Sequence, residues 1–158
     1  MASVIREVFI EAPEECCWDL LGDFAEGPQR FAPGYVTGSL LTEPGERLVT
    51  FTTGDVVRER LIAIDDQARR IVWAWVGDAV QPIHNNSSMQ VFAHGPDRSR
   101  LVWVHDVLPD ELVTGLAAAM DGGLPVIKQT LEAHANQQLG QIVPGPAPAK
   151  QEPAPLGY

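Results

Sequence analysis

Alternating hydrophobic and polar residues predict a series of β-strands along the first two thirds of the chain. The predicted strands cover residues 4–10, 36–41, 48–53, 56–64, 71–76, 83–93 and 101–108. Turn-forming residues separate most of the later strands, at 43–46, 54–55, 65–67 and 94–97. Regular strands linked by short turns predict a curled antiparallel sheet.

Beyond Pro109 the hydrophobic period changes to that of a helix. The apolar positions are Leu112, Leu116, Met120, Leu124, Ile127, Leu131 and Leu139. We therefore expect one long C-terminal helix, with Asp110 as its N-cap. Gly122-Gly123 and Pro125 interrupt this pattern, so a kink or a break is predicted there.

A short helical region is predicted between the first two strands. Residues 12–15 read Ala-Pro-Glu-Glu, and proline suits a first helical turn while carboxylates favour its positive end. This helix is expected to continue to Leu21. Gly27-Pro28 breaks the chain and leaves room for one further short helical segment around Phe24.

The chain length of 158 residues favours one domain. From Pro144 onward the sequence holds five prolines and little apolar bulk, which is typical of a disordered segment. We predict a folded ligand-binding domain over residues 2–141 and a disordered Pro/Ala-rich tail over residues 142–158.

Charge and cysteine content narrow the class of protein. Lys plus Arg number 11 against 21 for Asp plus Glu, a net charge of −10, which disfavours binding to nucleic acids and anionic membranes. Charges lie where the apolar segment of a signal peptide would be. The adjacent Cys16 and Cys17 are poorly placed to form a disulfide. A cytoplasmic protein without nucleic-acid or membrane partners is expected.

Cofactor motifs are missing from the sequence. The four histidines and two cysteines show no metal-ligand spacing, and no glycine-rich nucleotide motif or serine-hydrolase motif appears. We therefore expect neither a metal nor another cofactor.

The order strand, two short helices, six strands and long helix resembles the helix-grip fold of the START/Bet v 1-like (SRPBCC) superfamily, which includes the polyketide cyclase/dehydrase group. The segments that carry the resemblance are Ala12-Pro13-Glu14 to Trp18, the Gly54 hairpin, Glu59-Arg60-Leu61 to Asp65-Asp66, Ser87 to Val91, and Trp103 to Glu111. The resemblance implies an α+β fold in which a seven-stranded curved antiparallel sheet wraps around the long helix, with a cavity between them.

Strand alternation predicts which side chains line that cavity. In the strand from residue 56 to 64, the inward side chains are Val57, Glu59, Leu61 and Ala63. In the last strand two faces compete, and we favour the one with Trp103 and His105. The predicted ligand contacts are Arg47, Val49, Phe51, Leu61, Trp73, Trp75, Asn85, Ser87, Met89, Trp103, Met120 and Leu124. An apolar, aromatic cavity with a few polar points suits a hydrophobic ligand that carries oxygen functions.

Glu59 and His105 are the candidate catalytic residues. An inward carboxylate at Glu59 could act as a general acid or base, or could hold a ligand hydroxyl through water. Alternatively, it pairs with Arg47 and only ties two strands together; Arg47 in turn could bind a ligand carboxylate or enolate. His105 could exchange protons near pH 7, unless its side chain faces solvent.

Two functions from different classes remain open. One is a cofactor-free cyclase or dehydratase acting on a polyketide-like or other polycyclic substrate, as the resemblance implies. The other is a non-catalytic carrier or sensor of a small hydrophobic molecule, supported by the likeness of residues 57–66 to a strand of the plant abscisic-acid receptors. A structural partner of other proteins is a third alternative, and a homodimer through a sheet edge also remains open.

Overall fold

The computed structural model describes residues 2–77 and 82–142, with the side chain of residue 142 excepted. Its elements are β1 (Ala2–Ile10), α1 (Glu14–Leu21), α2 (Gly27–Phe31), β2 (Val36–Glu43), β3 (Glu46–Phe51), β4 (Val56–Asp65), β5 (Arg70–Trp75), β6 (His84–Ala93), β7 (Ser99–Leu108), the 3₁₀ turn η1 (Asp110–Leu112) and α3 (Val113–Ile142). The predicted order of strands and helices is confirmed. Apart from residue 142, the predicted tail lies outside the described residues.

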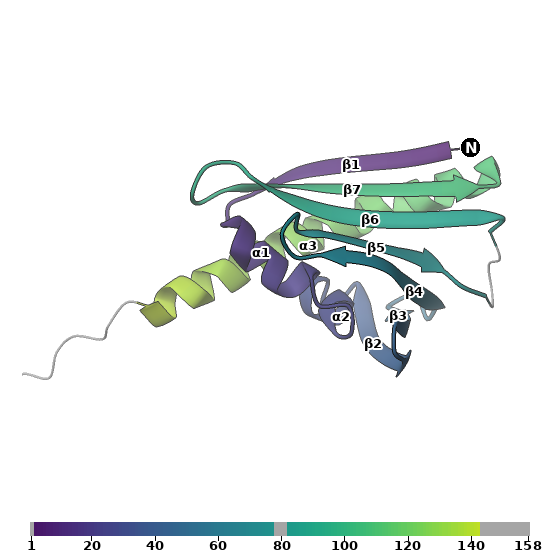
Figure 1. Ribbon diagram of the computed structural model, residues 1–158, viewed down its shortest axis with the longest axis horizontal. Coiled ribbons are helices and arrows are strands. Elements are labelled where there is room, and N and C mark those ends of the chain that lie inside the picture. The colour runs from purple at the N-terminus through teal and green to yellow at the C-terminus, as the bar shows by residue number, and fades with distance from the viewer. Residues whose placement is uncertain (1, 78–81, 143–158) are drawn as a thin grey trace, which may run out of the picture.

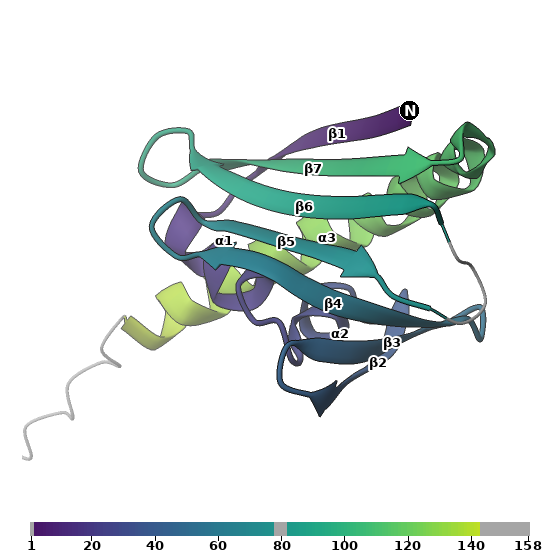
Figure 2. The same cartoon turned by 45° about the vertical axis from the view of Figure 1, so that its right-hand side comes forward.

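One antiparallel sheet of seven strands, in the order β1-β7-β6-β5-β4-β3-β2, forms the body of the fold. Helix α3 runs along one face of this sheet, and α1 and α2 lie beside it (Figure 1). The turned view shows how far the sheet curves from β1 to β2 (Figure 2). The predicted α+β helix-grip architecture is confirmed.

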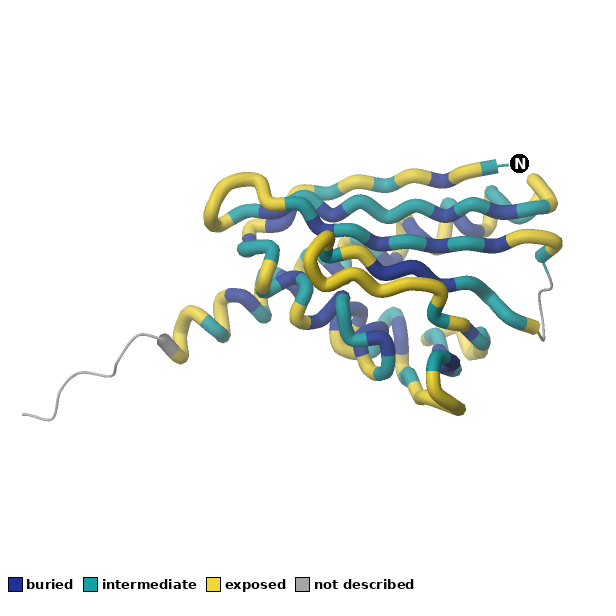
Figure 3. Tube along the Cα trace, in the orientation of Figure 1, coloured by how far each residue is buried: buried dark blue, intermediate teal, exposed yellow. Residues whose placement is uncertain are grey.

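The core lies between the sheet and α3. Buried and more exposed positions alternate along the central strands (Figure 3). Helix α3 contributes the buried side chains Leu116, Met120, Ile127, Leu131 and Ala135. Their spacing is that of one helical face, so burial of this apolar stripe is what holds α3 against the sheet.

The inward face of β7 is the one that carries His105. Leu101, His105 and Val107 are buried, whereas Val104 and Asp106 on the alternate face are only half-buried. The favoured face is therefore the inward one. Burial of alternate residues in β6 agrees with the predicted face of that strand as well.

Helix α3 corrects two predictions about its course. A kink or a break is predicted near Pro125, and the break is wrong, because the helix continues from Val113 to Ile142 with Pro125 inside it. Proline lacks an N–H group, but buried contacts on both sides, at Met120 and Ile127, hold the helix in place. The N-cap of η1 is Pro109, and Asp110 is the first residue of that turn rather than a cap.

Two further predictions also differ from the structure. The second short helix is α2, over Gly27–Phe31, so Pro28 begins a helix instead of breaking one. In β4 the register with β5 shifts between Leu61 and Ala63, and Ala63 is exposed rather than inward. Such a bulge inserts one residue and reverses the alternation beyond it.

Candidate functional site

Two pockets lie between the sheet and its helices. The inner pocket has a volume of about 60 Å³. The outer pocket has a volume of about 550 Å³ and reaches the surface at exposed residues such as Thr53 and Val56. Pockets for drug-sized ligands measure roughly 300–1,000 Å³, so only the outer one has room for a small molecule as it stands.

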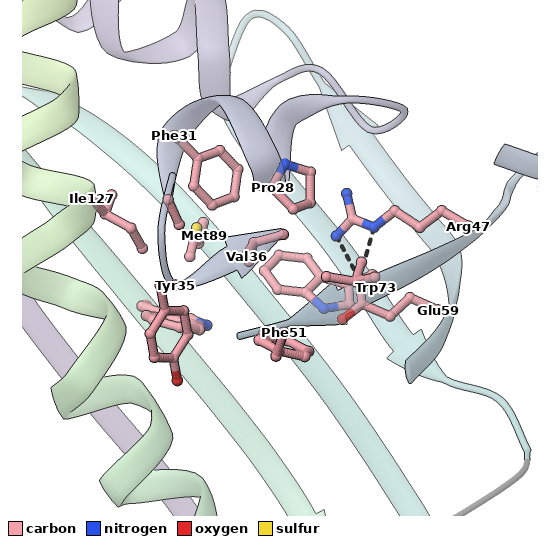
Figure 4. Close-up of a pocket in the computed structure, with 13 residues that line it drawn as sticks. Pro28, Phe31, Tyr35, Val36, Arg47, Phe51, Glu59, Trp73, Met89 and Ile127 are labelled. Carbon is pink, nitrogen blue, oxygen red and sulfur yellow. Dashed lines mark hydrogen bonds and ion pairs between the residues drawn. The ribbon is translucent and has the colours of Figure 1, made fainter. Parts of the chain in front are cut away.

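A buried ion pair, Arg47 with Glu59, lies at one side of the inner pocket (Figure 4). The two residues face each other on neighbouring strands, in the β3–β4 register. Arg47 Nε and Nη2 lie 2.7 and 2.6 Å from Glu59 Oε2. Arg47 Nη1 donates a further hydrogen bond, of 2.7 Å, to the backbone carbonyl of Phe24. The alternative that the two residues pair is confirmed; it does not exclude ligand contact.

Aromatic rings enclose this ion pair. The Arg47 guanidinium lies 4.3 Å from the ring centre of Phe24 and 5.5 Å from that of Trp73. Both charged residues are at least nine-tenths buried. Such a pair is costly to desolvate unless its hydrogen bonds are met, as those of Arg47 largely are here. The inner pocket therefore carries a polar, electrically balanced group in apolar surroundings.

The outer pocket lies between the β3–β4 hairpin, the end of β5 and the first turns of α3. Its lining residues are Tyr35, Phe51, Thr52, Thr53, Asp55, Val56, Val57, Trp75, Gly77, Leu112, Gly115, Leu116 and Ala119. Asp55 is the single charged side chain among these described residues. Aromatic and aliphatic groups otherwise form most of the surface, which suits an apolar ligand.

His105 is held by Asn85 at the inward face of β6 and β7. Asn85 Oδ1 accepts a 3.1 Å hydrogen bond from the backbone N–H of Trp75, which leaves its amide nitrogen to face His105 Nε2 at 2.6 Å. Nε2 must then be the acceptor, and the ring carries its proton on Nδ1. His105 also contacts the Trp75 ring edge-on, with ring centres 5.1 Å apart.

The protonation of His105 differs from the sequence expectation. Burial lowers its pKa to about 4, against a smaller opposing effect of Asp106. His105 is therefore neutral near pH 7 and does not change charge there, which corrects the expectation of a group that titrates at neutral pH. A buried imidazole loses more hydration when charged than when neutral, and this is the cause of the shift.

The pockets bring together only part of the predicted set. Arg47, Val49, Phe51, Glu59, Trp73, Met89 and Trp103 line the inner pocket, and Phe51 and Trp75 line the outer one. The predicted residues outside both linings are Leu61, Asn85, Ser87, His105, Met120 and Leu124. Asn85 and Ser87 form hydrogen bonds with other protein groups. Asn85 binds Trp75 and His105, as described above, and Ser87 Oγ accepts a hydrogen bond of 3.2 Å from Trp103 Nε1.

Several pocket residues escaped the sequence analysis. Pro28, Phe31 and Ala32 reach the inner pocket from α2 and the residue after it, and Tyr35 follows the turn at Gly34. None of them lies on a strand, so period-two alternation gave no sign of them. The only local signal was the density of aromatic and proline residues between the first helix and the second strand.

Within residues 2–77 and 82–142, no cluster of three or more His, Cys, Asp and Glu side chains is placed to hold a metal ion. None of the helices in these ranges is long and apolar enough to span a bilayer.

The chain belongs to the family of polyketide cyclases/dehydrases and lipid-transport proteins, whose pattern matches residues 1–133. A Streptomyces halstedii relative described as a "Putative polyketide cyclase" is 30% identical over 110 residues, which cover 66% of this chain and 88% of the relative. The resemblance drawn from the sequence is confirmed.

Solved structures share the fold. The Zhui aromatase/cyclase from Streptomyces sp. R1128 matches with a TM-score of 0.65 and 19% identity over 87% of this chain and 95% of its own. A START superfamily protein from Mycobacterium smegmatis matches with a TM-score of 0.64 and 17% identity, over 86% of this chain and 98% of its own. At these identities the likeness shows the architecture, and function depends on the pocket residues.

Proposed function

We propose that the protein binds a small, mainly apolar and aromatic molecule in its outer pocket. The observation that carries this proposal is the 550 Å³ pocket, lined mostly by aliphatic and aromatic side chains and reaching the surface. The family to which the chain belongs includes lipid-transport proteins, which agrees with a hydrophobic ligand. Trp75 offers the flat surface against which an aromatic ring can stack.

The charges around the pockets favour a ligand without a net charge. Asp55 is the charged residue in the described lining of the outer pocket, and the whole chain carries a net charge of −10. Arg47 would be the natural partner of an anion, but Glu59 already balances its charge. A hydroxyl or carbonyl group therefore suits the site better than a carboxylate.

Titration calorimetry with 2-naphthol tests the binding proposal. Gly115 lines the outer pocket, and a Cβ added there meets no atom within 4 Å, so the indole of Gly115→Trp has room to enter the pocket and should fill it. We expect this variant to bind 2-naphthol at least tenfold more weakly than the wild type. Gly140→Trp is the matched control, because Gly140 is also an α3 glycine with open space around it but lies outside both linings.

Either of two results would contradict the binding proposal. One is the failure of wild-type protein to bind 2-naphthol or a larger neutral aromatic alcohol such as 1-hydroxypyrene. The other is equal affinity of Gly115→Trp and Gly140→Trp, because binding would then lie elsewhere. Native mass spectrometry of the purified protein adds an independent reading: a retained molecule would reveal the natural ligand class.

A second candidate is catalysis of cofactor-free cyclisation or dehydration, and the buried Arg47–Glu59 pair favours it. Both contacts between Arg47 and Glu59 involve Oε2 of Glu59. The other carboxylate oxygen, Oε1, therefore remains available to accept a proton from an activated carbon or hydroxyl. Arg47 would orient a carbonyl oxygen of the substrate. His105 would then be a positioning residue, since it contacts Trp75, which lines the outer pocket.

Glu59→Gln tests the catalytic candidate on a linear poly-β-ketone substrate mimic. If Glu59 exchanges protons, this variant should lose at least a hundredfold in the rate at which water is eliminated, measured by mass spectrometry of the product. His105→Gln should reduce the rate less, because Gln retains an acceptor for Asn85. Full turnover by Glu59→Gln would exclude the acid/base role.

A further inference from the structure

Two aromatic rings separate the outer pocket from the inner one. Tyr35 and Phe51 are the only residues that line both pockets among those described. Their rings meet edge to face, with centres 5.8 Å apart. Phe51 ends β3, and Tyr35 directly precedes β2, which pairs with β3, so the two rings lie close together at this end of the strand pair. We call this pair the Tyr35–Phe51 partition.

Helix α3 holds the Tyr35 ring in place. The Tyr35 hydroxyl donates a 2.6 Å hydrogen bond to the backbone carbonyl of Ala119. The ring lies against Gly122 and Gly123, where an added Cβ would come within 3.4 and 3.1 Å of ring carbons. Glycine within a helix is unfavourable relative to alanine, so this glycine pair has a packing reason: it makes room for the ring.

The partition keeps a ligand in the outer pocket away from the ion pair. The Arg47–Glu59 pair lies on the inner side, in a pocket of about 60 Å³ that is too small for an aromatic ring. Figure 4 shows the Tyr35 hydroxyl turned away from this pair and towards α3. A ligand that extends from the outer pocket to Arg47 or Glu59 must therefore displace Tyr35 or Phe51.

We propose that Tyr35 determines how far a ligand penetrates, an inference that rests on the proposed binding function. With the Tyr35–Ala119 hydrogen bond formed, the outer pocket takes ring-sized molecules and the ion pair stays apart from them. When the Tyr35 ring swings away from α3, the two pockets join, and a longer ligand reaches Arg47 and Glu59. Tyr35 is thus a specificity residue that selects ligands by length.

Fluorine NMR of protein labelled with 5-fluorotryptophan separates the two pockets. Of the four tryptophans, Trp75 lines only the outer pocket, Trp73 and Trp103 line only the inner pocket, and Trp18 lines neither. Single Trp→Phe variants assign the resonances. With 2-naphthol we expect the Trp75 resonance of the wild type to shift while those of Trp73 and Trp18 remain in place.

Removing the partition should let the probe reach the inner pocket. In Tyr35→Ala we expect 2-naphthol to shift the Trp73 resonance as well, and in Tyr35→Phe, which loses only the hydrogen bond to Ala119, to shift it partly. Phe51→Ala should behave like Tyr35→Ala and serves if that variant folds poorly. Phe92→Ala is the control, because Phe92 is an aromatic residue outside both linings.

The outcomes distinguish this inference from the proposal beneath it. Equal shifts of Trp73 and Trp75 in the wild type, or a Trp73 resonance that stays in place in both Tyr35→Ala and Phe51→Ala, would overturn the role of the partition and leave outer-pocket binding intact. A wild-type protein in which no tryptophan resonance moves would overturn the binding proposal itself.

Discussion

Arg47 and Glu59 occupy positions where a charged residue is unusual, on the inward faces of the neighbouring strands β3 and β4. Their pairing explains how the fold tolerates them, since each charge is neutralised at under 3 Å. It does not explain why they are there. An apolar pair of similar volume often stabilises a core equally well, so retention of a buried ion pair is consistent with a role in the pocket.

Breaking this ion pair on one side should destabilise the protein strongly. Arg47→Met leaves the Glu59 carboxylate buried without a partner, so we expect the free energy of unfolding to fall by roughly 3–5 kcal/mol. The double variant Arg47→Met/Glu59→Leu should recover most of that loss. Urea denaturation measures both, and a double variant no more stable than the single one would contradict this explanation.

His105 should make stability depend on pH. Its pKa is about 4 in the folded protein and about 6.5 in the unfolded chain, so the unfolded chain binds more protons between these values. Stability is therefore fully present above about pH 6.5 and falls towards pH 4, by roughly 3 kcal/mol from this group. His105→Gln removes the titrating group, so the free energy of unfolding of this variant should fall by roughly 3 kcal/mol less than that of the wild type between about pH 7 and about pH 4. Parallel curves for wild type and variant in denaturant titrations would refute the prediction.

At the scale of the element, two glycines in the middle of α3 pack against an aromatic ring. Gly122 and Gly123 stand in its middle, beside the Tyr35 ring, while Gly115 has open space where a Cβ would go. The helix remains continuous through this stretch and through Pro125 because its apolar stripe is buried along the sheet. Tertiary packing, rather than helix propensity, keeps the helix continuous across Gly122, Gly123 and Pro125.

Two alanine substitutions in α3 should therefore have different effects. Gly115→Ala should raise the free energy of unfolding by up to about 1 kcal/mol, because alanine favours the helix. Gly123→Ala should gain less or lose stability, since its Cβ would lie 3.1 Å from the Tyr35 ring. Thermal unfolding of both variants measures these effects. The same two substitutions are also made in Tyr35→Ala protein, where the ring that would meet the Gly123 Cβ is absent. If Gly123→Ala gains as much as Gly115→Ala, the ring does not rest on that glycine.

For the molecule as a whole, the net charge of −10 is expected to weaken the binding of anionic ligands in the outer pocket. 2-Naphthoate has the ring size of 2-naphthol with a negative charge, and we expect it to bind roughly tenfold more weakly, about 1.4 kcal/mol. Added salt should narrow the difference, because it screens the acidic surface. Asp55→Asn should also reduce the difference in affinity between the two ligands. Tighter binding of 2-naphthoate than of 2-naphthol would contradict this prediction and would show that Arg47 is open to anions.

Much of the fold could be predicted because each strand or helix that buries one face has hydrophobic residues at a regular spacing in the sequence. The alternation in β6, from Asn85 to Val91, and the helical stripe from Leu116 to Leu131 both follow from burial of one face. The bulge after Leu61 could not be predicted in this way, because a register shift depends on the neighbouring strand.

The sequence by itself determined the order of the elements, the inward faces of most strands and the presence of a carboxylate and a guanidinium among apolar side chains. Only the tertiary structure decided that Arg47 and Glu59 neutralise each other, that Asn85 binds His105, and that Tyr35 divides the space into two pockets. The physical reason is the distance along the chain over which each feature is encoded. Hydrophobic periodicity shows which face of a single element is buried. A pocket depends on side chains from separate elements, which meet only when the sheet curves around α3.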